Sequence, residues 1–173
     1  MTPLPSIHPA ICIGSDTDAH ILYQFQRSAG HHWRRTPAPG WAIVHAAKSP
    51  WHRDMVGYQE RAAPPGPEQY VARRDRRMAL NLVDMDRQDP KLILPVLNQA
   101  SDFITEMVDE GLSVLVHCNM GLSRSPATVL WWMHLTVPEQ PHEEALAALL
   151  ADHPFTRRDS GIMALVREQW ALP

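Results

Sequence analysis

Residues 112–136 read LSVLVHCNMGLSRSPATVLWWMHLT, and this stretch changes character twice. Leu112–Val116 is an apolar run of strand length, and a helical pattern extends from Ser125 to about Thr136. Between them lies a short polar loop, His117–Ser123, that contains a glycine. A strand followed directly by a loop and a helix is typical of a domain that mixes helices with a parallel sheet.

The loop has the composition of an anion-binding site. Backbone N–H groups at the start of a helix lack partners, and Gly121 permits a tight or left-handed backbone that turns them toward one point. The helix dipole favours negative charge there, and Arg124 can hold two oxygens of a phosphate. The predicted phosphate-binding residues are Asn119, Met120, Gly121, Leu122, Ser123 and Arg124.

Cys118 stands at the opening of this loop. A thiol that faces N–H dipoles and a guanidinium has a pKa below the usual value of about 8.5, so the thiolate is populated at neutral pH. The loop is therefore predicted to bind a phosphate and to direct a nucleophile at its phosphorus.

The motif His117–Cys118, five further residues, then Arg124–Ser125 resembles the signature of cysteine-dependent protein tyrosine phosphatases. The form HCNMGLSRSP is most similar to the dual-specificity branch, including small bacterial and phage members. Ile11–Ser15 (ICIGS) resembles the first strand of that branch. The resemblance implies an α/β fold of the protein tyrosine phosphatase type, with a central, mostly parallel, twisted sheet of four to five strands flanked by helices.

The resemblance also implies a role for each signature residue. Cys118 would be the nucleophile that forms a phosphocysteine intermediate, and Arg124 would hold the phosphate oxygens. Ser125 would stabilise the thiolate when it leaves, and His117 would lower the pKa of the thiol through hydrogen bonds around it. Such chemistry implies no cofactor and no metal, and inhibition by vanadate-like anions.

The reaction also needs an acid to protonate the leaving group, which the family supplies from an aspartate roughly 30 residues before the cysteine. Asp84 is the first acid after the apolar run Met78–Val83, and aligning that run favours it. Aligning by spacing favours Asp86 instead. We prefer Asp84. Asp89 ranks third, because Pro90 suggests a place at a turn or a helix start.

Periodicity predicts the remaining elements of one domain over residues 1–173, with residues 1–9 as an extended N-terminal segment. Pro50–Ala72 is predicted to be mostly irregular. Three further strands are expected at Ala10–Gly14, Trp41–Ala46 and Met78–Val83. Helices are expected at Asp16–Gly30, Lys91–Glu110, His142–His153 and Asp159–Trp170.

Composition narrows the class of protein. With 45% hydrophobic and 20% charged residues, the 173-residue chain is typical of a globular domain. A net charge of −3 does not favour general binding to nucleic acid or anionic membranes. With only two cysteines, the chain has no disulfide framework. Met1–Pro9 has no apolar core and is not expected to be a signal peptide. No apolar run reaches the roughly 20 residues that a membrane span needs. A cytoplasmic protein is expected.

Several residues outside the signature are open to two interpretations. Lys48, His52 and Arg53 could border the phosphate site or simply pack in a loop. Cys12 is expected to be a buried strand residue, with redox pairing to Cys118 as the alternative. Trp131 and Trp132 are expected in the core. A basic cluster is expected to be a solvated face paired with local acids; it comprises Arg73, Arg74, Arg76 and Arg77.

The favoured function is hydrolysis of phosphotyrosine, and of phosphoserine or phosphothreonine, in phosphoproteins or phosphopeptides. One alternative is a non-protein substrate: an RNA 5′-phosphate, a phosphoinositide or an inositol phosphate. The uncharged side chains of the loop argue against a highly charged substrate, whereas the arginine cluster argues mildly for one. The other alternative is a catalytically inactive phosphate-binding module. The oligomeric state stays open.

Overall fold

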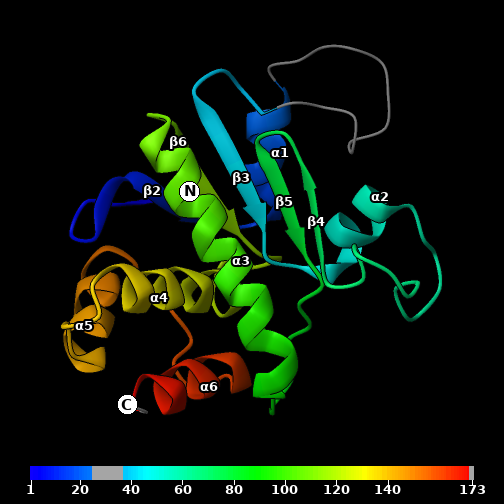
Figure 1. Cartoon of the computed structure of the whole chain (residues 1–173). Helices are drawn as coiled ribbons and strands as arrows, with labels where there is room; N and C mark the ends of the chain where they lie inside the picture. Colours follow the sequence, from blue (N-terminus) through cyan, green and yellow to red (C-terminus); the bar gives the residue numbers. More distant parts are fainter. Residues whose placement is uncertain (25–36, 172–173) are drawn as a thin grey trace.

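The computed structural model describes residues 1–24 and 37–171, whose centre is a mixed sheet (Figure 1). Within these residues the sheet has six strands in the order β1-β2-β6-β3-β5-β4. Neighbours among β2, β6, β3 and β5 are parallel, whereas β1 and β4 are antiparallel edge strands. The bounds are β1 Thr2–Leu4, β2 His8–Gly14, β3 Trp41–His45, β4 Val71–Arg74, β5 Arg77–Leu80 and β6 Ser113–His117.

The mostly parallel α/β sheet is confirmed, but it has six strands rather than the expected four to five. The two edge strands, β1 and β4, are three and four residues long. β1 contains Pro3, which an edge strand tolerates because only one of its sides is hydrogen-bonded. Strands this short leave no periodic signal, so the sequence did not reveal them. The central strands are apolar runs because both faces of a parallel sheet are covered.

The helices begin and end close to their predicted limits. The signature helix, α4, spans Arg124–Thr136, and α1 begins at Asp16 as expected. α1 is described only to Gln24, so its predicted end at Gly30 lies outside the described residues. The segment Pro50–Ala72, predicted mostly irregular, contains part of the helical turn η2 and the short helix α2. The bounds are α1 Asp16–Gln24, η2 Lys48–His52, α2 Arg53–Val56, α3 Pro90–Asp109, α4 Arg124–Thr136, α5 His142–Asp152 and α6 Gly161–Trp170.

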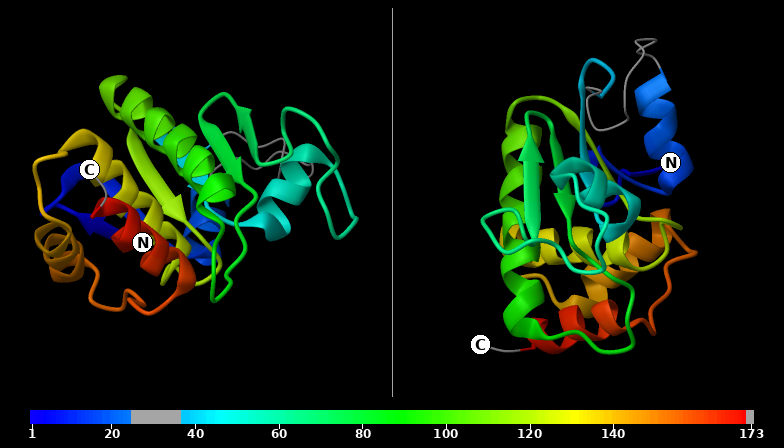
Figure 2. Two further views of the ribbon diagram at one scale, coloured as in Figure 1. Left: turned by 60° about the horizontal axis from the view of Figure 1, so that its bottom comes forward. Right: turned by 90° about the vertical axis from the view of Figure 1, so that its right-hand side faces the viewer.

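Helices cover both faces of the sheet. The right-hand view of Figure 2 shows α1 and α3 on opposite sides of it. α4 packs beside α3, with the buried Trp131 and Trp132 between them. The indole N–H of Trp131 donates to Asn98 Oδ1 at 2.7 Å, and that of Trp132 donates to Thr105 Oγ1 at 3.0 Å. Both tryptophans are therefore core residues, as predicted. Within the described part of the chain, no helix is long and apolar enough to cross a membrane.

The register of the parallel strands brings the carboxyl ends of three strands, β2, β6 and β3, side by side. Gly14 at the end of β2 lies opposite His117 at the end of β6, which in turn lies opposite His45 at the end of β3. The carboxyl ends of adjacent parallel strands are the usual location of binding sites in open α/β sheets. The predicted phosphate-binding loop follows β6 directly and therefore starts at these carboxyl ends.

Candidate active site

The loop between β6 and α4, residues 118–123, is called the signature loop below. Its shape depends on Gly121, which has φ of 77°. A Cβ atom on this residue would lie 2.8 Å from the carbonyl oxygen of Gly14, closer than real Cβ contacts. Glycine is needed here both for the left-handed backbone and for the close approach of the β2 end. This agrees with the conformation predicted for Gly121.

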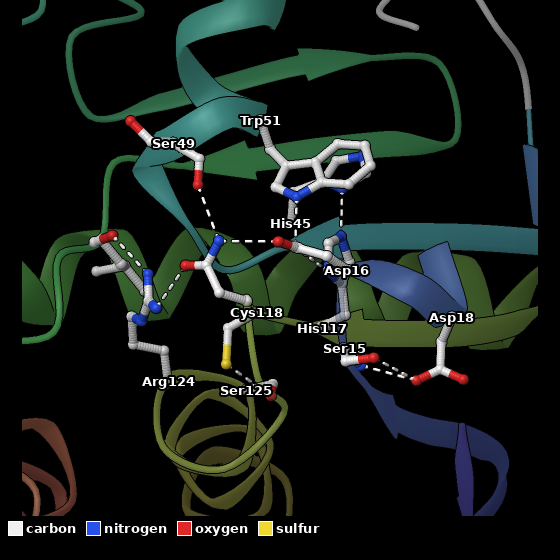
Figure 3. A network of polar contacts seen from close by, with 12 residues as sticks. Ser15, Asp16, Asp18, His45, Ser49, Trp51, His117, Cys118, Arg124 and Ser125 are labelled. Atoms are coloured by element: carbon white, nitrogen blue, oxygen red, sulfur yellow. Dashed lines mark hydrogen bonds and ion pairs between the residues drawn. The ribbon is translucent and has the colours of Figure 1, made fainter. Parts of the chain in front are cut away.

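Cys118 is buried at the base of the loop, with 2% of its surface exposed. The hydroxyl of Ser125 donates a hydrogen bond to its sulfur at 3.3 Å (Figure 3). Burial alone would raise the pKa of the thiol. The hydroxyl and backbone N–H of Ser125, the charge of Arg124 and the backbone N–H of Ser123 outweigh burial, so the net pKa of Cys118 is lowered. The thiolate is thus stabilised where the sequence predicted a nucleophile.

Arg124 begins α4, and its guanidinium contacts the side chain of Asn119 in the signature loop (Figure 3). One terminal nitrogen donates to the carbonyl of Leu82 at 3.3 Å, and the other donates to Asn119 Oδ1 at 2.7 Å. Its buried Nε has no hydrogen-bond partner. The two bonds fix the plane of the guanidinium, which keeps its donors oriented for a planar set of oxygens.

His117 is fully buried and belongs to a polar network behind the cysteine (Figure 3). Its Nδ1 lies 3.5 Å from the carboxylate of Asp16, and its Nε2 contacts His45 Nδ1. His45 Nε2 in turn meets the Tyr23 hydroxyl at 2.8 Å. Burial lowers the pKa of His117 despite the opposing effect of Asp16, and it lowers that of His45 further. A neutral imidazole pair therefore supports the start of the loop.

Asp16 connects this network to the signature loop. Its carboxylate accepts from Trp51 Nε1 at 2.7 Å and from Asn119 Nδ2 at 2.9 Å. Burial alone would raise the pKa of Asp16, but the nearby imidazole of His117 and the hydrogen bonds from Trp51 and Asn119 lower it on balance. Since Asn119 also accepts from Arg124, one amide links the arginine to α1. Asp16 therefore helps to position His117, which precedes the cysteine, and, through Asn119, the arginine.

Three aspartates were candidates for the acid, and they occupy different places. Asp84 Oδ1 accepts a hydrogen bond from the Ser123 hydroxyl at 3.3 Å, which holds its carboxylate against the signature loop. Asp86 lines a cavity of about 320 Å³ together with residues of α6 such as Gly161. Asp89 caps α3 by accepting from the Lys91 N–H at 2.9 Å. This capping role accounts for an aspartate at position 89 without any role in catalysis.

Residues 63–156 match the family model of the dual specificity phosphatase catalytic domain, more than half of the chain. The chain belongs to this family. The domain is therefore a cysteine-based phosphatase, acting on phosphorylated substrates through an anion-binding site. A comparison with curated proteins finds no match.

Solved structures agree with the fold of this dual specificity phosphatase domain. The human tyrosine phosphatase-like serine/threonine/tyrosine-interacting protein is 18% identical with a TM-score of 0.61, over 95% of this chain and 93% of that chain. Human DUSP28 is 14% identical with a TM-score of 0.62, over 98% and 94%. PTPMT1 in complex with PI(5)P is 16% identical with a TM-score of 0.54, over 92% and 89%. At these identities the likeness shows the fold.

The basic residues for which a place at the rim of the phosphatase site was one of two interpretations make hydrogen bonds to a neighbouring loop. Lys48 Nζ donates to the carbonyl of Arg61, and Arg53 donates to the carbonyls of Gln59 and Glu60. His52 is buried, and its two ring nitrogens meet the Tyr58 hydroxyl and the Glu68 carbonyl. These contacts support loop packing, and a place of the half-buried Lys48 and Arg53 at the rim stays a prediction. The rim role for His52 is wrong, because its side chain has no exposed surface to offer a substrate.

The arginine cluster is mostly paired with local acids, as expected. Arg73 makes two hydrogen bonds to Glu106, at 2.7 and 2.6 Å, and Arg74 binds Glu68. Arg76 lies 3.8 Å from Asp75. Arg77 departs from the expectation, since it is buried on β5 and interacts with the Tyr23 hydroxyl. The cluster therefore contains structural residues as well as a solvated face.

Cys12 is a buried residue of β2, as predicted, and its register excludes the alternative of pairing with Cys118 in this fold. Cys12 lies opposite Leu115, three residues before Cys118. At about 3.3 Å per residue, the two cysteines are separated by roughly 10 Å along the strands. A disulfide needs Cα atoms within about 7 Å. Burial raises the pKa of Cys12, which makes it the less reactive thiol.

Sequence reasoning missed the side chains behind the cysteine, namely Asp16, Trp51 and the supporting role of His45. The only local signal was the position of Asp16 directly after the Ile11–Ser15 run that resembles the family. The contact from Asn119 to Asp16 joins residues 103 positions apart. No spacing rule relates them, because the strand register creates the contact. Within the described ranges, no three His, Cys, Asp or Glu side chains gather to hold a metal ion.

Proposed function

We propose that this domain hydrolyses phosphotyrosine, and phosphoserine or phosphothreonine, in proteins through a phosphocysteine intermediate and without a metal. The observation that carries the proposal is the hydrogen bond from Ser125 to the Cys118 sulfur in the first turn of α4, which also carries Arg124 (Figure 3). This hydrogen bond stabilises the thiolate of Cys118, and Cys118 opens a loop whose backbone N–H groups can bind an anion. A single domain over residues 1–173 and a cytoplasmic location stay predictions.

In the first step, the Cys118 thiolate attacks phosphorus and the bond to the leaving oxygen breaks. Arg124 and the backbone N–H groups of residues 119–124 bind the three remaining oxygens. Asp84 gives its proton to the leaving oxygen, so that an alcohol or phenol departs rather than its anion. The contact of Asp84 with Ser123 supports this assignment, because it holds the carboxyl group beside the loop.

In the second step, water attacks the phosphocysteine and the phosphorus–sulfur bond breaks. The carboxylate of Asp84 accepts the proton of the water, and Cys118 leaves as a thiolate. The Ser125 hydroxyl stabilises this thiolate, since a hydrogen bond favours the charged form of its acceptor. His117 touches no substrate in this scheme; it holds Cys118 in place through the network that ends at Asp16.

Phosphoprotein substrates are favoured by the uncharged side chains of the signature loop, which carries no lysine to bind further phosphates. Arg73 and Arg74 are held by Glu106 and Glu68, which leaves less free positive charge for an RNA. The alternative substrate is a non-protein phosphate. PTPMT1 was solved with PI(5)P, so this fold also accommodates a lipid headgroup. An inactive module is disfavoured because the cysteine, the arginine and an acid are all present.

The test is hydrolysis of an aryl phosphate between pH 5 and 8 with a chelator present. We expect turnover by the unmodified protein and a loss of at least about 100-fold in Cys118→Ser, because an alkoxide nucleophile is unavailable from serine at this pH. Cys12→Ala, which removes the other thiol, is the matched control and keeps its activity. Residual activity above about 1% in Cys118→Ser would contradict the nucleophile assignment. A folded protein with no turnover supports the inactive module.

A further inference from the structure

Two large apolar side chains stand out beside the signature loop. Phe155 is 77% exposed and Met120 is 71% exposed, the two highest values among the exposed large hydrophobic residues described. Met120 belongs to the loop itself, next to Gly121. Phe155 lies in the segment between α5 and α6, far away in sequence but attached to the same loop.

The attachment of Phe155 is rigid. The N–H and the hydroxyl of Thr156 both donate to the carbonyl of His153, at 3.2 and 3.0 Å, and so close a turn with Phe155 near its tip. Pro154 restricts the backbone of this turn further. The imidazole of the buried His153 donates from Nε2 to the carbonyl of Gly121 at 2.8 Å. On the other side, the Arg157 N–H donates to the carbonyl of Leu122 at 2.7 Å.

Phe155 is therefore held between two anchors on consecutive residues of the signature loop. A single exposed hydrophobic residue is common and needs no explanation. An aromatic ring on a closed turn differs, because the backbone that carries it is already fixed and loses little conformational entropy when a ligand covers the ring. Aromatic side chains are enriched among the residues that dominate binding energy at interfaces.

We propose that Phe155 and Met120 form a contact surface for a large apolar side chain next to the phosphorylated residue of a substrate peptide. The inference rests on the proposed function and names the substrate class more closely. With the phosphate in the signature loop, the neighbouring residues of the peptide pass over Met120, and the anchored turn places Phe155 beside them. Covering both side chains removes apolar surface from water, which favours binding.

The surrounding charges favour an apolar peptide over an anionic surface. Asp84 and Asp86 are exposed on the segment beside the loop, and the chain carries a net charge of −3. These carboxylates repel an anionic membrane or a polyphosphate. The guanidinium of Arg157 lies 3.3 Å from Asp159, so part of its charge is already matched. The apolar surface of Phe155 and Met120 thus lies between these carboxylates and the exposed Arg157 and Arg158.

The experiment compares kcat/KM for two phosphotyrosine peptides that differ only in one residue beside the phosphotyrosine, leucine or glutamate. A small aryl phosphate reports the chemistry without that residue. We expect the unmodified protein to prefer the leucine peptide about tenfold, and Phe155→Ala to lose that preference while hydrolysing the aryl phosphate at an unchanged rate. Phe155→Leu should keep part of the preference. The matched control is Leu135→Ala, since Leu135 is another exposed apolar residue and lies at the far end of α4.

Different results separate the inference from the function on which it rests. Turnover of the aryl phosphate but of neither peptide contradicts the proposed function. Equal turnover of both peptides, or an equal loss for both in Phe155→Ala, overturns the inference alone. A preference for the glutamate peptide that disappears in Arg157→Ala also overturns it. So does a Phe155 requirement seen only with phosphatidylcholine vesicles that contain a phosphoinositide, because the apolar surface would then bind a membrane.

Discussion

A single hydroxyl contacts the sulfur of Cys118, and the charge of the nucleophile depends on it. In Ser125→Ala the pKa of Cys118 should rise, because burial remains and the largest opposing interaction is gone. We expect thiol alkylation by iodoacetate to need higher pH than in the unmodified protein. Turnover at pH 6 should fall roughly 10- to 100-fold, since a hydrogen bond to a charged group contributes about 1.5–3 kcal/mol. An unshifted alkylation profile would show that the hydroxyl does not stabilise the thiolate.

Asp84 and Asp86 are two residues apart but lie in different surroundings, so they can be distinguished by the leaving group of the substrate. Asp84→Asn should slow alkyl phosphates at least about 100-fold more than aryl phosphates with acidic phenols, which depart without a proton. Asp86→Asn is the matched control, because it removes the same charge from the same segment. Steady-state rates over a series of leaving groups provide the measurement. If only Asp86→Asn changes the dependence on the leaving group, the assignment to Asp84 is wrong.

At the scale of elements, a glycine decides how the signature loop meets the end of β2. Gly121 and Gly111 have nearly the same φ, 77° and 78°, but a Cβ would meet the Gly14 carbonyl only at Gly121. At Gly111, which follows α3, nothing lies within 4 Å. Substitution of Gly111 therefore tests the effect of the positive φ alone, whereas substitution of Gly121 adds a steric clash with the Gly14 carbonyl.

Gly111→Ala should lower the free energy of unfolding by about 1 kcal/mol and leave turnover unchanged, because only the backbone angle is unfavourable. Gly121→Ala should destabilise the protein more and reduce kcat at least about 100-fold, since a displacement of about 1 Å misplaces the groups that hold the phosphate. Denaturant unfolding and aryl phosphate hydrolysis measure the two effects. Equal activity losses in the two variants would refute the role of the Gly121–Gly14 approach.

At the scale of the whole molecule, the sheet register keeps the two cysteines apart. Oxidation of Cys118 by peroxide should therefore give a sulfenic acid without an intramolecular disulfide to Cys12. We expect the same rate of inactivation in Cys12→Ala as in the unmodified protein, and the same recovery with a thiol reductant. Mass spectrometry under non-reducing conditions detects the disulfide directly. A Cys12–Cys118 peptide would require the strands to slide or separate, and would contradict the register described here.

Local chemistry along the chain was sufficient to predict the signature loop and most elements. The nucleophile, the arginine and the serine lie within eight consecutive residues, 118–125, so their arrangement follows from one strand, one glycine turn and one helix start. Helix limits were close because periodicity and caps act between near neighbours. The solved structures confirmed the fold class, and the family match showed a dual specificity phosphatase domain, whereas the roles of the individual site residues stay predictions. The assignment of Asp84 as the acid stays a prediction, supported by its contact with Ser123.

Contacts between remote segments were decided by the tertiary structure alone. The two edge strands form only because β2 and β5 offer hydrogen-bonding partners, and Asp16 meets Asn119 only because β2 and β6 are adjacent. Likewise, the turn that holds Phe155 reaches the signature loop through His153, 32 residues from Gly121. Backbone angles and helical faces depend on neighbouring residues, which a sequence displays. The register of a sheet and the docking of loops depend on packing of the whole chain, and they determine what surrounds the predicted nucleophile.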